Sequence, residues 1–486
     1  MGSLTKTWMM KSFRQPGTGR PDKGRFVRYV SGMLAALGSA FIIGDMVAQE
    51  AWRYLALLAA VALALCWPLE VALGTYVFTV PFNAVTVLGE SSAGTTLNWV
   101  LGALAGTALL SVGILTRRLH WPSRPAWWAA LFVGWALLSS LWSLQMESAK
   151  HWIPTVASVA LLYLVATCWN VNEKQFSIIT RLIIAGGCLA AGYTVFQYAR
   201  GVTWVSFMGT TTRGSLVVEG REVNPNSLGT DLLLPFSLAM AWFFSARRWL
   251  NSLLAFSAAG VIMAAVLITV SRGSILSACV VMAVYFLRLN KKRRMLLIGS
   301  AVLATALLLP GSFFSRMKSS IHDAGSGRLD IWTVGLDMVK HHGIIGVGLE
   351  NFPVLYDEYA GRAPRFVGYG RGAHNIYLET AVEFGIVGMI FLTAALVSHI
   401  RLVRRLWAKA RSMRMQVLPL EAACWAMAVA GLFEAIIWDK SFWLTWMLCL
   451  MAAQIQPRAS ETPVPAPEPE KFWQAEFAEH QQTYSY

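Results

Sequence analysis

The sequence contains few charged residues: Asp, Glu, Lys and Arg together make up only 14% of its 486 residues, compared with about 25% in soluble domains. It has only six cysteines, all within apolar runs and none in a Cys-x-x-Cys spacing. This argues against a disulfide framework or a thiolate metal site and predicts small, buried side chains. There is no glycine-rich nucleotide loop, no internal repeat and no acidic pair of the kind that binds a metal–nucleotide complex. We therefore expect neither a metal nor a cofactor.

Hydrophobic residues, in contrast, make up 56% of the chain. Several apolar runs reach the roughly 18–20 residues that a helix needs to cross a bilayer. These runs predict an all-α, polytopic integral membrane protein with about 12–14 transmembrane helices. The smaller number applies if neither of the two short runs that meet at Pro68 crosses.

The basic residues predict how these helices are oriented. Of the 41 Lys and Arg residues, 23 lie in five short segments between apolar runs: 1–28, 117–124, 247–248, 288–294 and 401–414. Cytoplasmic loops are enriched in Lys and Arg, and alternating the spans brings all five segments to one side. The net charge of +15 is therefore explained by orientation in the lipid bilayer, and nucleic acid is not an expected partner.

This topology divides the chain into three regions. Residues 1–28 form a basic cytoplasmic N-terminus, residues 29–456 the transmembrane domain, and residues 457–486 a cytoplasmic tail whose repeated Pro and Glu predict disorder. The first apolar run is about 20 residues long, which suits an uncleaved signal anchor. Two polar segments, 199–226 and 312–373, are predicted to lie on the outer face.

The polar segment 312–373 is predicted to contain a helix on the membrane surface. Four apolar residues recur there at helical spacing: Leu329, Trp332, Leu336 and Val339. Arg328 and Asp330 would lie on the wetter side of this helix. His341 and His342 are interpreted as part of a solvated turn.

Arg272 lies in a Ser-Arg-Gly turn between two apolar helices, at the predicted outer boundary of the membrane. A charge at membrane depth is costly and is a functional candidate by default. The alternative is a snorkelling arginine bound to lipid headgroups, which we disfavour because such residues normally lie at the cytoplasmic end. Gly273 would let another group approach this turn closely.

His374 is a candidate base, because it stands where an apolar helix begins after the long polar segment. The positive end of a helix dipole favours a neutral imidazole. The alternative is an interfacial residue that only hydrogen-bonds lipid headgroups. Asn375 and Glu379 lie in the first turns of this helix. Glu379 and Glu383 are one turn apart, so they share a face that is predicted to look into the bundle.

Arg213 and Arg221 lie in the polar segment 199–226, just before Asn224 and Asn226. Converging guanidinium groups suit the oxygens of a phosphate or pyrophosphate, whereas either arginine alone could be an ordinary solvated loop residue. Nucleotides are not supplied outside the cytoplasm. The predicted outward arginines and candidate base therefore indicate a lipid-linked pyrophosphate as the activated donor.

Six short motifs, in order, resemble the O-antigen ligase/polymerase family of bacterial envelope enzymes. They are Arg221-Glu-Val-Asn-Pro-Asn-Ser-Leu, Ser271-Arg272-Gly273-Ser, Gly327-Arg328-Leu-Asp-Ile-Trp332, Gly346-Val-Gly-Leu-Glu-Asn-Phe352, His374-Asn-Ile-Tyr-Leu-Glu379 and Glu383-Phe-Gly-Ile-Val-Gly388. Each motif is weak alone, but six in the same order, all on the predicted outer face, are specific. The resemblance is close over residues 221–388 and looser across the remaining helices.

The resemblance implies a metal-independent, inverting membrane glycosyltransferase of the bacterial inner membrane, which takes glycan from undecaprenyl pyrophosphate on the periplasmic side. In that family the arginines that match Arg221 and Arg272 grip the pyrophosphate, and Arg213 is a further candidate for the same role. The histidine that matches His374 is the base that acts on the acceptor hydroxyl. The residues expected to support them are Arg328, Asn226, Asn375 and Glu379.

The acceptor divides this family into two activities. A polymerase transfers the growing chain onto a lipid-linked repeat unit, which is the activity we favour, and a ligase transfers the finished chain onto lipid A–core. The expected partners are thus the lipid-linked donor, a glycan or lipid A–core acceptor, the bilayer and proteins of envelope polysaccharide assembly. A competing class is a flippase of lipid-linked sugar, which would carry charged sites near the midplane. Here the polar residues gather at the outer face, apart from Glu70, Arg181 and Glu434.

Overall fold

The computed structural model describes residues 52–86, 96–205, 212–218, 221–289, 294, 296, 298–299, 327–409 and 411–455. These residues are mostly helical, with two short antiparallel two-stranded sheets, so the all-α prediction is confirmed. The predictions for residues 1–28, for the first apolar run and for the tail 457–486 lie outside the described residues.

The helices, in chain order, are α3 (Trp52–Cys66), η1 (Pro68–Leu73), α4 (Gly74–Thr79), η2 (Val80–Val85), α5 (Leu97–Thr116), α6 (Arg124–Leu138), η3 (Ser139–Trp142), α7 (Met146–Thr167), α8 (Glu173–Ala199), α9 (Pro225–Asp231), α10 (Leu233–Ser245), α11 (Trp249–Ile268), α12 (Arg272–Arg288), α15 (Arg328–His342), α16 (Phe352–Tyr359), η4 (Ala360–Arg362), α17 (Ile376–Glu383), α18 (Gly385–Lys409), α19 (Arg414–Ala430) and α20 (Lys440–Ala452). Strand β1 (Trp204–Val205) pairs with β2 (Thr212–Arg213), and β3 (Val217–Val218) pairs with β4 (Arg221–Glu222).

Seven helical segments of the described chain are long and apolar enough to cross a membrane: α5, α6 with η3, α7, α8, α9 with α10, α11 and α18. An eighth candidate is a pair of helical segments, 58–66 and 68–83, which meet at a bend of 116°. The two short apolar runs thus meet at a sharp bend beside Pro68, as expected for proline at a helix break. Helices α12 and α19 have 17 residues each and α20 has 13. They fall short of the usual span length, and the apolar run near residues 295–309 lies largely outside the described residues, so fewer spans meet that length than were predicted.

Contacts between side chains show that basic segments far apart in the sequence share one end of the bundle. Glu421 is buried and accepts hydrogen bonds from Arg288 Nη2 at 2.6 Å and from Arg404 Nε at 3.0 Å, so the ends of α12 and α18 meet. At the start of α19, Gln416 donates to Glu173 at the start of α8, at 3.1 Å. Arg288 and Arg404, from two of the basic segments, therefore lie at the same end of the bundle, as the orientation of the spans predicted.

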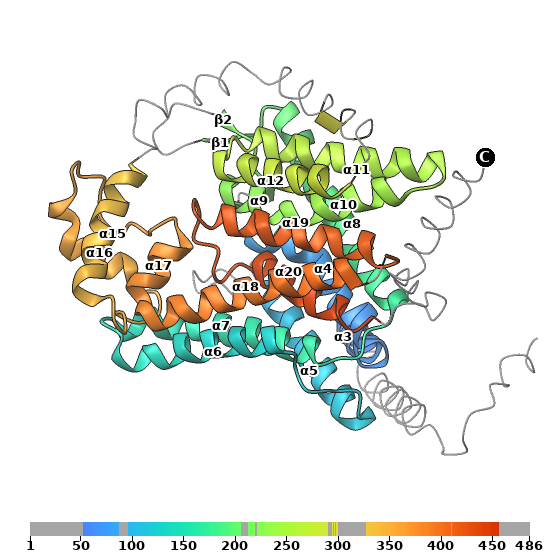
Figure 1. Cartoon of the computed structure of the whole chain (residues 1–486), viewed down its shortest axis with the longest axis horizontal. Helices are drawn as coiled ribbons and strands as arrows, with labels where there is room; N and C mark the ends of the chain where they lie inside the picture. Colours follow the sequence, from blue (N-terminus) through green and yellow to red (C-terminus); the bar gives the residue numbers. More distant parts are fainter. Residues whose placement is uncertain are drawn as a thin grey trace, which may run out of the picture.

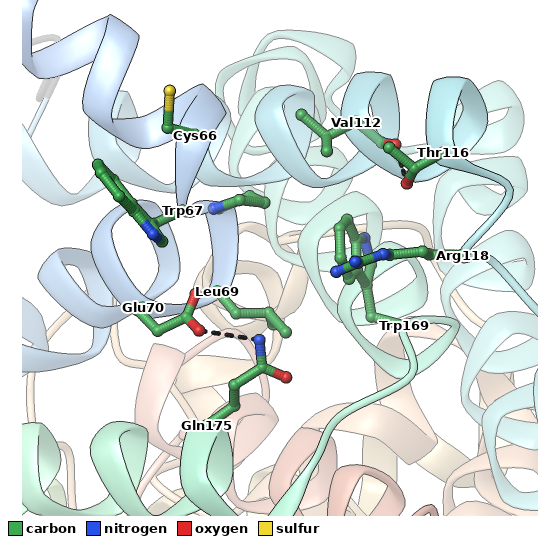
Figure 2. A pocket seen from close by; sticks show the side chains of 10 residues that line it. Cys66, Trp67, Leu69, Glu70, Val112, Thr116, Arg118, Trp169 and Gln175 are labelled. Atoms are coloured by element: carbon green, nitrogen blue, oxygen red, sulfur yellow. Dashed lines mark hydrogen bonds between the residues drawn. The ribbon is translucent and has the colours of Figure 1, made fainter. Parts of the chain in front are cut away.

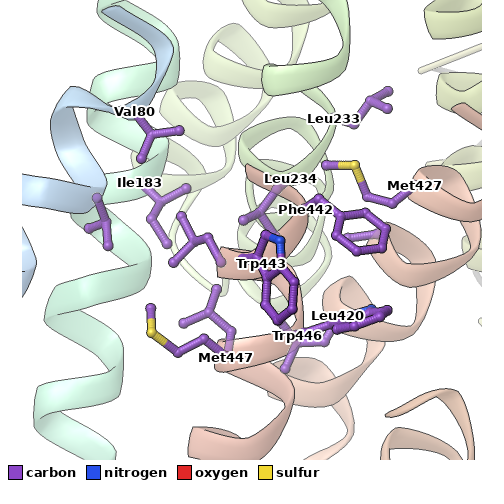
Figure 3. Close-up of a cluster of buried hydrophobic side chains, with 14 of the residues drawn as sticks. Val80, Ile183, Leu233, Leu234, Leu420, Met427, Phe442, Trp443, Trp446 and Met447 are labelled. Carbon is purple, nitrogen blue, oxygen red and sulfur yellow. The ribbon is translucent and has the colours of Figure 1, made fainter. Parts of the chain in front are cut away.

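The buried centre of the bundle is α20. Residues 441–452 of this helix are all buried, which is typical of a helix that is apolar all round and surrounded by others. Figure 3 shows Phe442, Trp443 and Trp446 of α20 packed among side chains of η2, α8, α10 and α19. Because α20 begins at Lys440, this packing anchors the preceding segment 431–439, which contributes to the site described below.

All six cysteines are free. Cys424 and Cys449 are buried between α19 and α20, as predicted, whereas Cys279 on α12 is exposed. The prediction was wrong for Cys279 because a membrane helix is apolar on its outward as well as its inward positions, so an apolar run does not by itself mark a buried residue.

Helices α15, α16 and α17 lie together at one end of the bundle (Figure 1) and enclose a hydrophobic cluster of their own. α15 confirms the helix predicted in the long polar segment, but the prediction for Asp330 was wrong. Asp330 is buried and accepts a hydrogen bond from Arg365 Nε at 3.2 Å, and Ile331 is buried beside it. Leu329 and Leu336 are exposed instead. The reason is that α15 must cover the cluster with one face, so its polar residues there are paired within the protein.

Candidate functional site

The site is built from the first residues of helices that are distant in the sequence, together with the segment 431–439. Arg272 is the first residue of α12 and Arg328 the first residue of α15, while His374 comes just before α17. Glu434, in the segment between α19 and α20, lies between Arg328 and His374. The N-terminal ends of α12 and α15 carry the partial positive charge of their helix dipoles, which adds to the charge of their arginines.

Glu434 links the candidate base to one of the arginines. One carboxylate oxygen, Oε1, lies 4.0 Å from His374 Nδ1, and the other, Oε2, lies 3.6 Å from Arg328 Nη2. The Glu434 side chain is only 12% exposed. A carboxylate with so little solvent needs nearby cations or hydrogen-bond donors, and both of these neighbours are candidate functional residues.

Two glycines allow the Glu434 segment to pack against its neighbours. A Cβ atom on Gly273 would lie 2.8 Å from Phe433 Cβ, so only glycine leaves room for Phe433 beside Arg272. On the other side, the N–H of Ile376 donates to the carbonyl of Gly431 at 2.8 Å. The close approach expected at Gly273 is thus made by the protein's own Phe433, and it places the next residue, Glu434, in the site.

The backbone around His374 is held in an uncommon conformation. His374 has a φ of +48°, in the left-handed region that few non-glycine residues adopt. The side chain of Asn375 caps α17 by accepting from the N–H groups of Tyr377 and Leu378 at 3.0 and 3.1 Å. On the other side, Trp332 Nε1 of α15 donates to the Ala373 carbonyl at 3.0 Å. The turn that carries His374 is therefore fixed from both directions.

The charges of the site act on each other. Burial lowers the pKa of the Arg328 guanidinium, Glu434 opposes this effect, and the neighbouring Arg272 lowers the pKa further. Burial also lowers the pKa of His374 to about 4, with additional repulsion from Arg328 and Arg371. His374 is therefore a neutral imidazole at neutral pH, which is the form that can accept a proton.

Burial raises the pKa of Glu434 to about 7. The neighbouring Arg328 and Arg213 and the amide of Asn226 act in the opposite direction, whereas Asp439 adds to the increase. The Glu434 carboxyl group is therefore influenced by four residues from four separate parts of the chain.

Arg213 and Asn226 belong to the same neighbourhood, and Arg213 is tied to the protein. Arg213 is 3% exposed; its Nε donates to the Thr269 carbonyl at 2.7 Å and its Nη2 to Asn226 Oδ1 at 2.5 Å. Its guanidinium also lies over the Trp204 ring, 5.4 Å from the centroid. Arg221, in contrast, is exposed on β4. Arg213 therefore joins the polar segment to the ends of α9 and α11, while Arg221 remains accessible.

Further carboxyl groups lie near Glu434, and two of them, on α17, are buried. Glu379 and Glu383 of α17 are 8% and 1% exposed, so the predicted inward face of this helix is confirmed, and Glu383 Oε1 accepts from the Phe352 N–H at 3.0 Å. Burial raises the pKa of Glu350 to about 7 and that of Asp439 to about 6. Within the described residues, no group of three or more His, Cys, Asp or Glu side chains could hold a metal ion.

Glu434 is the site residue that the sequence did not reveal. It had been set apart with Glu70 and Arg181 as a charge away from the outer-face residues, whereas the structure places it between Arg328 and His374. The available signal was its position in a short connection between two apolar runs, close to the charged residues Asp439 and Lys440. His341 and His342, at the far end of α15, are not part of the site.

A separate pocket lies at the other end of the bundle. Figure 2 shows it between the turn at Pro68, α5 and the start of α8, where Glu70 accepts from Gln175 Nε2 at 2.8 Å. Gln175 is near the start of α8, whereas Gln197, near its end, donates to the Val217 carbonyl beside β4 at 2.6 Å. These two residues are about 33 Å apart along the helix, so the pocket is not part of the candidate site.

Residues 255–393 match a family model described as O-Antigen ligase. The matched segment contains Arg272, Arg328 and His374, whereas Arg213 and Glu434 lie outside it. No curated protein matches the chain. This match supports the resemblance of the chain to the O-antigen ligase/polymerase family, and the helices around the matched segment are those of a polytopic membrane protein.

Proposed function

We propose that the protein is a membrane glycosyltransferase of the bacterial inner membrane that transfers glycan from undecaprenyl pyrophosphate, without a metal ion, on the periplasmic side. The observation that carries this proposal is that Arg328 and His374 flank Glu434, while Arg272 lies close enough to Arg328 to act on its charge. These residues combine a cluster of cations with a neutral imidazole, which are the two groups that such a transfer needs. The family match adds support, because it covers the three residues that supply them.

In this proposal the arginines stabilise the leaving group. When the bond between the sugar and the pyrophosphate breaks, its electron pair remains on the pyrophosphate, which gains negative charge. Arg272 and Arg328 would pair with those oxygens, with Arg221 contributing from β4 and Arg213 holding Asn226 in place. Fixed cations in a site with little solvent stabilise such a charge strongly.

His374 would act on the acceptor. The neutral imidazole takes the proton of an acceptor hydroxyl as its oxygen bonds to the anomeric carbon. Attack from the side opposite the pyrophosphate inverts that carbon. Asn375 and Glu379 would support this step indirectly, since Asn375 caps α17 and Glu379 is buried within it.

For the acceptor, we favour a lipid-linked repeat unit, which makes the protein a polysaccharide polymerase. The second candidate is ligation of the finished glycan to lipid A–core, which the description of the matched family favours. Both reactions use the same donor and the same base, so the acceptor alone separates them.

The test uses purified protein in nanodiscs with an undecaprenyl-pyrophosphate oligosaccharide, with and without lipid A–core, and with a chelator in place of metal. A ladder of lengthened lipid-linked glycans would support the polymerase. One product that requires lipid A–core would support the ligase. If neither appears and the same protein moves lipid-linked sugar across proteoliposomes, glycan transfer is the wrong function and the flippase class replaces it.

A further inference from the structure

The two carboxylate oxygens of Glu434 face different residues. Oε1 faces His374 Nδ1 at 4.0 Å and Oε2 faces Arg328 Nη2 at 3.6 Å. The first distance is longer than a hydrogen bond, but catalytic hydrogen bonds are often long without substrate and shorten when it binds. The Glu434 carboxylate thus stands between His374, the candidate base, and Arg328, a candidate to bind the leaving pyrophosphate.

The position of Glu434 follows from the packing around it. Segment 431–439 is held at Gly431 by the N–H of Ile376 and at Phe433 by contact with Gly273. These contacts join it to the residues that follow His374 and Arg272, respectively. A carboxylate held in this way keeps its direction when neighbouring side chains move, which is what a group that orients another residue requires.

An imidazole needs such a partner to act as a base in a defined direction. Its two nitrogens are equivalent candidates for the single proton of the neutral ring, and the hydrogen bond made by one nitrogen decides which of them keeps a lone pair. With the proton on Nδ1, directed at Glu434, the lone pair is on Nε2. A nearby carboxylate also stabilises the imidazolium that forms when Nε2 takes a proton.

We propose that Glu434 is a positioning residue that holds His374 in the Nδ1–H form and stabilises its imidazolium during transfer. The role in transfer rests on the proposed function. In that step the acceptor proton moves to His374 Nε2, the acceptor oxygen bonds to the anomeric carbon, and the bond to the pyrophosphate breaks with its electrons. Glu434 stays ionised throughout, and the imidazolium later returns the proton to solvent.

The first test needs no substrate. Protein in nanodiscs is labelled with ¹⁵N at its histidine rings, and the His374 signals are identified by their loss in His374→Asn. The ¹⁵N shifts of the wild-type protein are expected to show the Nδ1–H form, and Glu434→Ala is expected to shift the ring towards the Nε2–H form. Glu147→Gln is the matched control, because Glu147 is exposed and pairs only with Lys150 among the described residues, at 2.7 Å. An Nε2–H ring in the wild type, or an Nδ1–H ring that stays unchanged in Glu434→Ala, would overturn the proposal.

The second test separates orientation from folding. Glu434→Gln keeps the shape of the side chain but removes its charge, so kcat is expected to fall about 100-fold or more. Removing a negative charge next to Arg328 should leave donor binding unchanged or tighter, whereas a general loss of structure would weaken it. A fall in both kcat and donor affinity, or a wild-type kcat, would contradict the proposal.

The pH profile gives a third readout. Ionised Glu434 forms as the pH rises through about 7, while His374, whose pKa is lowered to about 4, is already neutral there. The groups that face the pair are Arg328 and Arg371 near His374, and Arg328, Arg213, Asn226, Asp439 and Glu379 near Glu434. The wild-type rate is expected to rise with pH through this region, and Glu434→Gln is expected to lose that rise. An unchanged profile in Glu434→Gln would count against the proposal.

If neither the wild-type protein nor any variant transfers glycan but the His374 ring responds to Glu434→Ala, the proposed function fails and the pairing of Glu434 with His374 stands.

Discussion

Gly273 gives the most specific prediction about the assembly of the site. In Gly273→Ala, the new Cβ would lie 2.8 Å from Phe433 Cβ, whereas carbon atoms prefer about 3.5–4.0 Å. Phe433 Cβ is attached directly to the backbone, so a side-chain rotation does not relieve the clash. The segment that carries Glu434 must therefore move away by about 0.7–1.2 Å.

The expected effect is larger on activity than on stability. Overpacking costs about 1–3 kcal/mol, but alanine is better than glycine in a helix by about 1 kcal/mol, so the net loss of stability is about 0–2 kcal/mol. A displacement of about 1 Å at a reacting group can cost about 100-fold in rate. We expect the transfer rate in nanodiscs to fall about 10–100-fold, with a small change in the midpoint of thermal unfolding.

The matched control for this substitution is Gly260→Ala in α11, where an added Cβ has no atom within 4 Å. Gly260→Ala should keep the full rate and the same or a higher unfolding midpoint. A wild-type rate in Gly273→Ala would refute the idea that the contact between Gly273 and Phe433 positions Glu434.

The remaining predictions concern the supports of the site and its charge. Glu421→Gln removes a buried carboxylate from Arg288 and Arg404, whose side chains are 31% and 53% exposed. The substitution should lower the free energy of unfolding by about 1–3 kcal/mol and leave the rate per folded molecule unchanged. An unchanged unfolding midpoint would contradict this prediction. Trp332→Phe loses the hydrogen bond to the Ala373 carbonyl and should cost about 1 kcal/mol and slow transfer several-fold, measured by unfolding and by rate, whereas a faster rate would be inconsistent with this support. A ¹⁵N titration should find His374 neutral down to about pH 4 because burial, Arg328 and Arg371 lower its pKa. Arg371→Gln should raise that pKa by removing one like charge, and a decrease would show that Arg371 does not act on His374.

Much of the helical frame could be predicted from the sequence, because apolar runs and basic segments are local patterns along the chain. The Ser-Arg-Gly turn predicted that Arg272 stands at a helix start, and the spacing of apolar residues predicted α15. The same patterns do not report which residues meet across the bundle. The sequence therefore predicted the wrong face of α15 for Asp330. This residue is buried and paired with Arg365, 35 residues away in the sequence.

Glu434 shows the limit of local patterns most clearly. Nothing next to it in the sequence marks a site, and its position depends on contacts of its neighbours Gly431 and Phe433 with Ile376 and Gly273. These contacts exist only after α12, α17 and α19 have packed together. A glycine in the sequence suggests that another group packs closely against the backbone there, but only the folded structure identifies that group.

The central claim, that one site binds the donor pyrophosphate through its arginines and activates the acceptor through His374, is tested most directly by separating binding from transfer. Donor affinity and single-turnover rate would be measured in nanodiscs for Arg272→Ala and His374→Ala, with the exposed Arg200→Ala as control. The account predicts that Arg272→Ala weakens donor binding about 10–100-fold, and that His374→Ala binds the donor normally but transfers about 100–10,000-fold more slowly. Wild-type binding and transfer in both variants would contradict it.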